Sequence, residues 1–193
     1  MKIFVTGFHR AGSHTISKLL ARENNLPWIE EHNVDLWDFR RVIALTNSAP
    51  NGFVLQCPFL AHKVKELIWY GNKVYWADRN KKHVIKSMDK GGFKGTALII
   101  IKQFYDEFPD DPYWNTPTFD DEDIKKYLLL KEGDKYPQLE TKKWIKYYKL
   151  MVDVKEYFLE TRFKDFVEVV RLEDLPEYNK LKGKKPLKGW GHD

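Results

Sequence analysis

Cysteine is almost absent from this sequence: Cys57 is the only one in 193 residues. A single cysteine cannot form an internal disulfide framework and, without companion cysteines, it cannot build a thiolate zinc cluster. The disulfide-rich secreted classes and the zinc-ribbon classes are therefore excluded. We expect a reducing compartment, the cytoplasm.

Long hydrophobic runs are also lacking. No stretch approaches the roughly 20 apolar residues that span a bilayer. The apolar start, residues 1–5, gives way to Gly7, His9 and Arg10 before a signal-peptide core is complete. We therefore expect no membrane anchor, no export and no membrane partner.

Neither sign of charge dominates strongly, because 33 Lys and Arg against 28 Asp and Glu leave a formal net charge of +5. This balance favours anionic partners, but it does not separate nucleic acid from a nucleotide, a sulfated or phosphorylated ligand, or simple solubility. Hydrophobic residues make up 42% and aromatic residues 15%, enough for a buried core. A single core remains efficient up to roughly 250 to 300 residues, so one domain over residues 1–193 is predicted.

Short apolar strands alternate with amphipathic helices along the chain. Strands are predicted within residues 2–7, 26–31, 52–58, 72–79 and 165–176, and helices within 13–23, 34–47, 59–71, 81–92 and 141–162. This alternation is typical of βαβ units. It predicts an α/β fold, a three-layer sandwich with a mostly parallel central sheet.

Two segments do not follow this rhythm. Residues 106–138, rich in Pro, Asp and aromatic side chains, are predicted to be a lid or an insertion. Their aromatic residues could stack on a ligand ring or pin the segment to the core. The lysines of the carboxyl-terminal tail could clamp a phosphate or form a solvated tail; they are Lys182, Lys184, Lys185 and Lys188.

The turn after the first strand has the composition of a phosphate cradle. Residues 5–16 are VTGFHRAGSHTI, and a helix that begins here directs free N–H groups and its dipole toward an anion. Gly7 and Gly12 let the backbone curl closely, Arg10 adds a forked cation, and Ser13 and Thr15 add hydroxyls. The competing interpretation is a glycine turn without a ligand.

Two motifs together resemble those of the sulfotransferase family. Gly7 and Gly12 have the separation of a Walker A loop, but Ser13 stands where that loop has its lysine. The pattern G-x-x-R-x-G-S-x-T resembles instead the 5′-phosphosulfate loop of sulfotransferases. Arg79 at a strand end, with Ser87 eight positions later, resembles the family's 3′-phosphate motif.

The resemblance covers most of the chain outside residues 106–138, including segments 53–80 and 142–175. It implies a P-loop NTPase-like sulfotransferase fold, closer to the glycan and protein branch. It also implies the donor 3′-phosphoadenosine-5′-phosphosulfate (PAPS), the product 3′,5′-adenosine bisphosphate and no metal. Two departures concern the acceptor side: many relatives have Lys where Gln56 stands, and the family's glycine-rich carboxyl-terminal loop is represented only by KPLKGWGHD.

The resemblance also implies roles for individual residues. Arg10 would stabilise charge on the bridging oxygen, the loop N–H groups would hold the 5′-phosphate, and Arg79 and Ser87 would hold the 3′-phosphate. The implied donor-binding residues are Arg10, Ala11, Gly12, Ser13, His14, Thr15, Arg79 and Ser87.

An acceptor hydroxyl also needs a base within hydrogen-bond reach. Glu31 is the first candidate, because Glu31-His32 resembles the Glu-x-His or Glu-His pairs of glycan sulfotransferases. His62 is the second, by analogy with the histidine base of the cytosolic small-molecule branch. The alternatives are a solvated acidic pair or helix cap at Glu31 and a helix-surface histidine at His62.

The predicted function is that of an enzyme, a PAPS-dependent sulfotransferase acting on an unidentified glycan, small molecule or protein. An atypical P-loop small-molecule kinase is one alternative, although the missing loop lysine disfavours ATP hydrolysis. A non-catalytic nucleotide- or nucleic-acid-binding protein is the other. The acidic DDEDI segment and the lack of a basic stripe on any predicted helix argue against nucleic acid as a partner.

Overall fold

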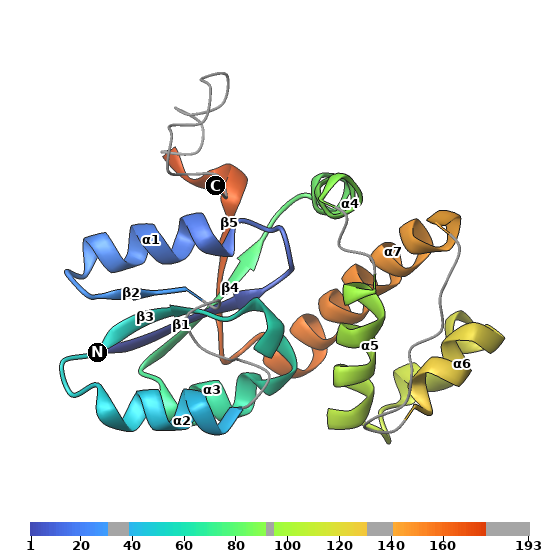
Figure 1. The fold of residues 1–193 in the computed structure, drawn as a ribbon, viewed down its shortest axis with the longest axis horizontal. Coiled ribbons are helices and arrows are strands. Elements are labelled where there is room, and N and C mark those ends of the chain that lie inside the picture. Colours follow the sequence, from blue (N-terminus) through green and yellow to red (C-terminus); the bar gives the residue numbers. More distant parts are fainter. Residues whose placement is uncertain (31–38, 92–94, 131–140, 177–193) are drawn as a thin grey trace.

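The computed structural model describes residues 1–30, 39–91, 95–130 and 141–176, which form an α/β fold around a five-stranded sheet (Figure 1). The strands are β1 (Lys2–Gly7), β2 (Trp28–Ile29), β3 (Phe53–Gln56), β4 (Lys73–Asp78) and β5 (Glu168–Arg171). Their order is β2-β3-β1-β4-β5, and every pair is parallel. The predicted α/β fold with a mostly parallel sheet is confirmed.

The central strands are apolar on both faces because helices cover both faces. Strand β3 is buried along its whole length, and β1 and β4 are buried except near their ends. In the register, Val5 of β1 lies beside Gln56 and Gly7 beside Ala77. Residues that follow β1, β3 and β4 therefore meet at one edge of the sheet, where open parallel sheets bind ligands.

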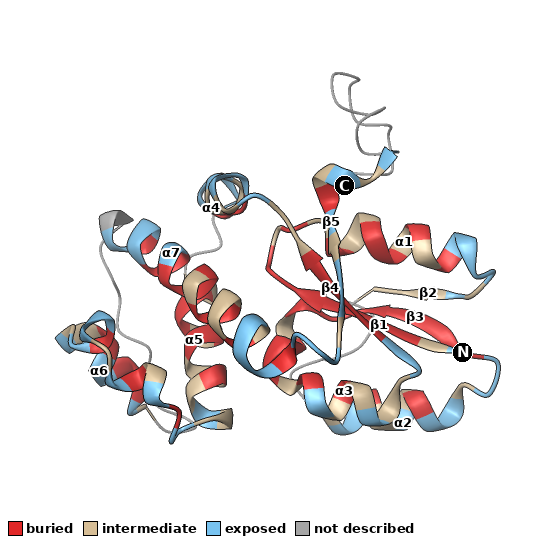
Figure 2. Cartoon of the chain, turned by 180° about the vertical axis from the view of Figure 1, so that it is seen from behind, coloured by how far each residue is buried: buried red, intermediate tan, exposed pale blue. Residues whose placement is uncertain are grey.

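Three helices make the outer layers of the sheet. Helix α1 (Ser13–Glu23) covers one face, and α2 (Phe39–Ser48) and α3 (Val64–Tyr70) lie on the other (Figure 1). The remaining helices gather to one side of the sheet (Figure 1): α4 (Lys81–Lys90), α5 (Thr96–Glu107), α6 (Glu122–Leu128) and α7 (Thr141–Phe158). The facing sides of α5 and α7 are buried together with the strands (Figure 2).

Short helical turns link these elements. In the described part of the chain four are 3₁₀ turns: η2 (Pro58–Lys63), η3 (Pro112–Asn115), η4 (Pro117–Phe119) and η6 (Leu172–Asp174). The π-helical turn η5 (Leu159–Phe163) continues α7. The helix predicted over residues 59–71 is therefore divided, because Leu60 has non-helical dihedral angles and α3 begins only at Val64.

Much of the segment predicted as a lid or insertion packs against the core. Within residues 106–130, the structure places η3, η4 and α6 against α5 and α7, with Trp114 and Phe119 buried. Tyr113 stacks on Tyr157 of α7 at 4.1 Å between ring centroids. These aromatic residues pin the segment to the core. The lid or insertion stays a prediction, and residues 131–138 lie outside the described part.

Candidate anion-binding site at the carboxyl edge of the sheet

The loop between β1 and α1 needs glycine at both its ends. Gly7 has φ +118° and its missing Cβ would lie 2.5 Å from the Ala77 carbonyl oxygen. Gly12 has φ +88° and a Cβ there would lie 2.6 Å from the Leu172 side chain. Both φ values belong to the region that favours glycine. Close packing of the loop against β4 and η6 therefore requires these glycines independently of any ligand.

The amino terminus of α1 offers backbone donors. Its N-cap is Gly12, which has no side chain to cap the helix, and no acidic residue stands in the first turn. The first hydrogen bond of the helical pattern joins the Ile16 N–H to the Gly12 carbonyl oxygen at 3.0 Å. The N–H groups of Ser13, His14 and Thr15 have no helical acceptor. With the helix dipole, they form a site suited to an anion.

Arg10, Ser87 and Arg79 meet at this loop. The Arg10 Nε donates to Ser87 Oγ at 3.1 Å, and Arg79 Nη1 donates to the Arg10 carbonyl oxygen at 3.2 Å. Burial, and next the Arg79 guanidinium, lower the pKa of Arg10 from its ordinary value. The structure therefore brings together the residues of the two motifs that sequence analysis assigned to two phosphates of one nucleotide.

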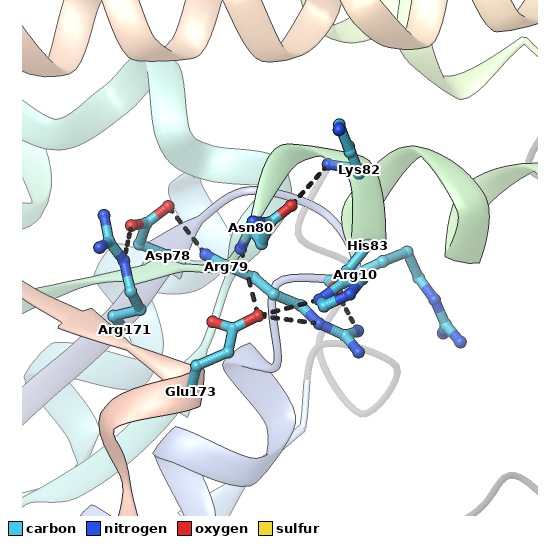
Figure 3. Close-up of polar contacts among 8 residues, drawn as sticks. All are labelled: Arg10, Asp78, Arg79, Asn80, Lys82, His83, Arg171 and Glu173. Atoms are coloured by element: carbon cyan, nitrogen blue, oxygen red, sulfur yellow. Dashed lines mark hydrogen bonds and ion pairs between the residues drawn. The ribbon is translucent and has the colours of Figure 1, made fainter.

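A carboxylate from the end of β5 orients the Arg79 side of the site (Figure 3). Glu173 Oε1 accepts from the Asn80 N–H at 3.2 Å, contacts His83 Nδ1 at 3.2 Å and lies 3.8 Å from Arg79 Nε. Burial raises the pKa of Glu173, but contacts with His83, the Asn80 N–H and Arg79 lower it more. This carboxylate is therefore well placed to aim Arg79.

A second ion pair stands beside the first. Asp78 Oδ2 accepts from Arg171 Nε at 2.9 Å, and Asp78 Oδ1 accepts from the Arg79 N–H at 2.8 Å. A cavity of about 630 Å³ opens here, lined among others by Phe8, Arg79 and Glu156. The cavity is lined by both acidic and basic side chains, whereas the loop between β1 and α1 carries only the cation of Arg10.

Ser13 and Gln56 lie on the β3 side of the loop. Gln56 Nε2 donates to Ser13 Oγ at 3.4 Å, and both side chains are buried. An amide therefore lies beside the loop at the position where many sulfotransferases have Lys.

Beneath the loop lie two buried groups whose roles sequence analysis did not find, His9 and Lys155. Lys155 Nζ donates to the Gly7 carbonyl oxygen at 2.5 Å and lies 3.1 Å from His9 Nδ1. Burial, Lys155 and Arg10 lower the pKa of His9 well below its ordinary value, so His9 is neutral. The available signal was a lysine within the apolar stripe of the helix over residues 141–162.

The two predicted bases have different outcomes. Glu31 lies outside the described residues. His62 is in η2 and is only 9% exposed, so the alternative of a helix-surface histidine is wrong. Burial, then Lys63 and Lys155, lower the pKa of His62 to about 3. A histidine with this pKa is a weak proton acceptor.

Glu30, which sequence analysis passed over, does reach the loop. Its Oε1 lies 3.5 Å from His14 Nε2, and the His14 ring packs edge-on against Trp28 at 5.1 Å between centroids. The same WIEEH stretch that suggested Glu31 contains Glu30, so the signal was present one residue earlier. This His–carboxylate pair is partly exposed at the end of β2.

Comparison with known proteins gives no assignment: no family model matches the chain, and no curated protein matches it. None of the helices in the described ranges is long and apolar enough to cross a membrane. Across those same ranges, no group of three or more His, Cys, Asp or Glu side chains is arranged to hold a metal ion. Any functional assignment therefore rests on the geometry of the site.

Proposed function

We propose that this protein is a sulfotransferase that moves a sulfuryl group from PAPS to a hydroxyl or amine of an acceptor. One observation carries the proposal: Arg10, Ser87 and Arg79 converge at the uncapped amino terminus of α1. The parallel sheet with this loop after its central strand supports the finer fold in the proposal, a P-loop NTPase-like sulfotransferase fold.

The residues present fit the two phosphates of such a donor. The N–H groups from Gly12 to Thr15, together with Arg10, would hold the 5′-phosphate. The Ala11 N–H, also expected there, instead donates to the Phe8 carbonyl oxygen at 3.2 Å. Arg79, which Glu173 and the Arg10 carbonyl orient, would hold the 3′-phosphate with the Ser87 hydroxyl. A ligand with two separated phosphates would match these two groups better than one with a single phosphate chain.

The chemistry asks little covalent work of the protein. The bond from sulfur to the bridging oxygen of the 5′-phosphate breaks, a bond from sulfur to the acceptor oxygen or nitrogen forms, and the acceptor proton passes to a base. Arg10 would neutralise the charge that develops on the leaving phosphate oxygen. Positioning and charge stabilisation would supply most of the rate, as in phosphoryl transfer.

Glu31 remains our first candidate for the base. The His14–Glu30 pair is an additional candidate, because it lies at the end of β2 beside the loop. The low pKa and deep burial of His62 make it the weaker choice.

The decisive test is calorimetric titration with 3′,5′-adenosine bisphosphate, with ATP as the competing ligand. We expect tight binding of the bisphosphate and weak binding of ATP. Arg79→Ala should lower bisphosphate affinity at least tenfold, since it removes a charged contact of about 1.5 to 3 kcal/mol. Lys86→Ala, at an exposed neighbour of Ser87 on α4, is the matched control and should bind as the wild type does.

Two outcomes would overturn the proposal. Unchanged bisphosphate affinity in Arg79→Ala would show that the phosphate site is placed wrongly. Tight ATP binding with magnesium-dependent turnover would favour a kinase.

A further inference from the structure

We propose that Lys155 of α7 is the positioning residue of the phosphate loop, holding its backbone at Gly7 and supplying from another element the positive charge that the loop lacks at Ser13. This inference rests on the proposed function only in naming the anion as the donor's 5′-phosphate. Lys155 is 148 residues from Gly7 along the chain, so the contact depends on the tertiary fold.

The side chain of Lys155 is fully buried, at 0% exposure. Its Nζ is one hydrogen bond from the loop backbone, 2.5 Å from the Gly7 carbonyl oxygen. Taking a lysine out of water is costly, and apolar residues of similar volume are often as stable or more stable at such positions. A buried lysine in an otherwise apolar helix face therefore calls for a reason beyond stability.

Lys155 stands in the turn of α7 just before the helix changes its hydrogen-bonding pattern. The π-helical turn η5 follows directly, and such turns are frequent at functional sites. Phe158 and Phe163, on either side of that transition, pack against Phe108, which fixes the end of the helix.

Lys155 also fixes the hydrogen-bonding state of His9. An ammonium group only donates, so His9 Nδ1 accepts from it at 3.1 Å. Neutral His9 therefore carries its proton at Nε2. That buried atom has no acceptor among the described residues, and it belongs to the loop that would meet the anion.

Lys155 thus acts on the loop in two ways. It ties the Gly7 carbonyl to α7, and it places an ammonium group against His9 of the same loop. Its contacts with Gly7 and His9 lie in the loop, whereas Arg79 and Ser87 follow β4, so we expect a larger effect on the 5′-phosphate than on the 3′-phosphate.

The test compares two ligands that differ only in the 5′-phosphate: 3′,5′-adenosine bisphosphate and adenosine 3′-monophosphate. Lys155→Met should weaken bisphosphate binding at least about tenfold, since a nearby charge is lost in a partly buried site. Its affinity for the monophosphate should change less than about twofold. Lys155→Arg keeps the charge and should keep the ratio of the two affinities within about threefold of the wild type.

Lys149→Met, at an exposed lysine of the same helix, is the matched control and should bind both ligands as the wild type does. Equal loss of both affinities in Lys155→Met would show a merely structural role and overturn the inference. An unchanged ratio would also overturn it. If the wild type binds neither ligand, the proposed function itself fails.

A spectroscopic measurement on the wild type needs no variant. The ¹⁵N shifts of the His9 ring should show the neutral Nε2–H tautomer across pH 5.5 to 8. Proton occupancy at Nδ1, or titration of His9 near its ordinary pKa of 6.5, would overturn the positioning of His9 by Lys155.

Discussion

Arg10 holds a left-handed backbone conformation, φ 64°, although it carries a large side chain. This conformation costs a residue with a Cβ about 1 to 2 kcal/mol. Such strain concentrates at ligand-binding sites, where the surrounding structure holds it in place. The geometry of Arg10 is consistent with selection for its guanidinium rather than for stability.

Substitution of Arg10 should therefore separate binding from stability. Arg10→Gly relieves the backbone strain but removes the cation, so we expect a free energy of unfolding within about 1 kcal/mol of the wild type. Arg10→Ala keeps the strain and should be less stable than Arg10→Gly by about 1 kcal/mol. Both should lose at least about tenfold in bisphosphate affinity. Urea denaturation and calorimetry measure the two effects, and wild-type affinity in Arg10→Gly would contradict this role.

The two loop glycines should differ in their tolerance of a methyl group. In Gly7→Ala the new Cβ meets the backbone of Ala77, which belongs to a central strand and cannot move away. In Gly12→Ala it meets the flexible side chain of Leu172. We expect a loss of about 3 kcal/mol or more for Gly7→Ala and about 1 to 2 kcal/mol for Gly12→Ala in urea denaturation.

Leu172→Ala provides the control for this pair. Added to Gly12→Ala it should recover part of the lost stability, because it removes the steric conflict but not the unfavourable φ. Added to Gly7→Ala it should recover nothing. Equal losses for the two glycine variants would argue against the close contact of β1 with β4.

At the residue scale, the sequence pointed to groups that follow strands and missed groups that reach the site from elsewhere. The meeting of Arg10, Arg79 and Ser87 could be predicted, because their motifs follow two strands whose ends the parallel sheet brings together. Lys155 could not be placed, because its partners in the loop lie almost 150 residues away.

At the element scale, local patterns predicted all five strands but not every helix. Helix α5 (Thr96–Glu107) was not predicted. Its continuous run of apolar residues is compatible with either a buried strand or a buried helix, so the pattern alone does not decide between them. The structure resolves the ambiguity by burying α5 against α7. The helical turns after Asp106 also escaped prediction, since Pro and Asp are typical of loops.

Asp111 joins one of these turns to the end of α7. Its carboxylate accepts from the Tyr157 hydroxyl and from Arg162 Nη2, each at 2.8 Å, and from the Tyr113 N–H at 3.0 Å. Burial raises the pKa of Asp111, but these three donors lower it below its ordinary value of 3.8. The segment after α5 is therefore held by an ionised carboxylate.

A lowered folded-state pKa gives Asp111 a defined pH dependence. Its stabilising effect is complete above the ordinary pKa of 3.8 and is lost as the pH falls through the lower folded-state value. We expect Asp111→Asn to cost about 1 to 3 kcal/mol at pH 7. The free energy of unfolding of Asp111→Asn should also fall less steeply between pH 4 and pH 2 than that of the wild type. Denaturation curves between pH 2 and 7 measure both effects.

Asp120 is the matched control for Asp111. It lies in the same segment with its side chain 72% exposed, and it forms a solvent-exposed ion pair with Lys125 at 3.0 Å. Asp120→Asn should change stability by less than about 0.5 kcal/mol at every pH. If Asp111→Asn behaved in the same way, the carboxylate would not be what holds the segment.

At the scale of the whole molecule, charge is distributed unevenly. The net charge is only +5, yet Arg10, Arg79 and Lys155 gather at one edge of the sheet. Burial first, and then the neighbouring cations, lower the pKa of Arg10 and of His9 there. Cations held together in a fold repel one another until an anion binds. Binding of an anionic ligand should therefore raise the free energy of unfolding of the protein.

Thermal unfolding tests this expectation. At 100 times the dissociation constant, 3′,5′-adenosine bisphosphate should stabilise the fold by about 2.7 kcal/mol. For a domain of this size, that free energy corresponds to a rise in Tm of about 5 to 10 °C. At the same ligand concentration, Arg79→Ala should show little of this rise in Tm. The exposed-site variant Lys86→Ala should show the full rise. An equal rise with ATP would mean that this edge binds polyphosphates in general and does not recognise a 3′-phosphate.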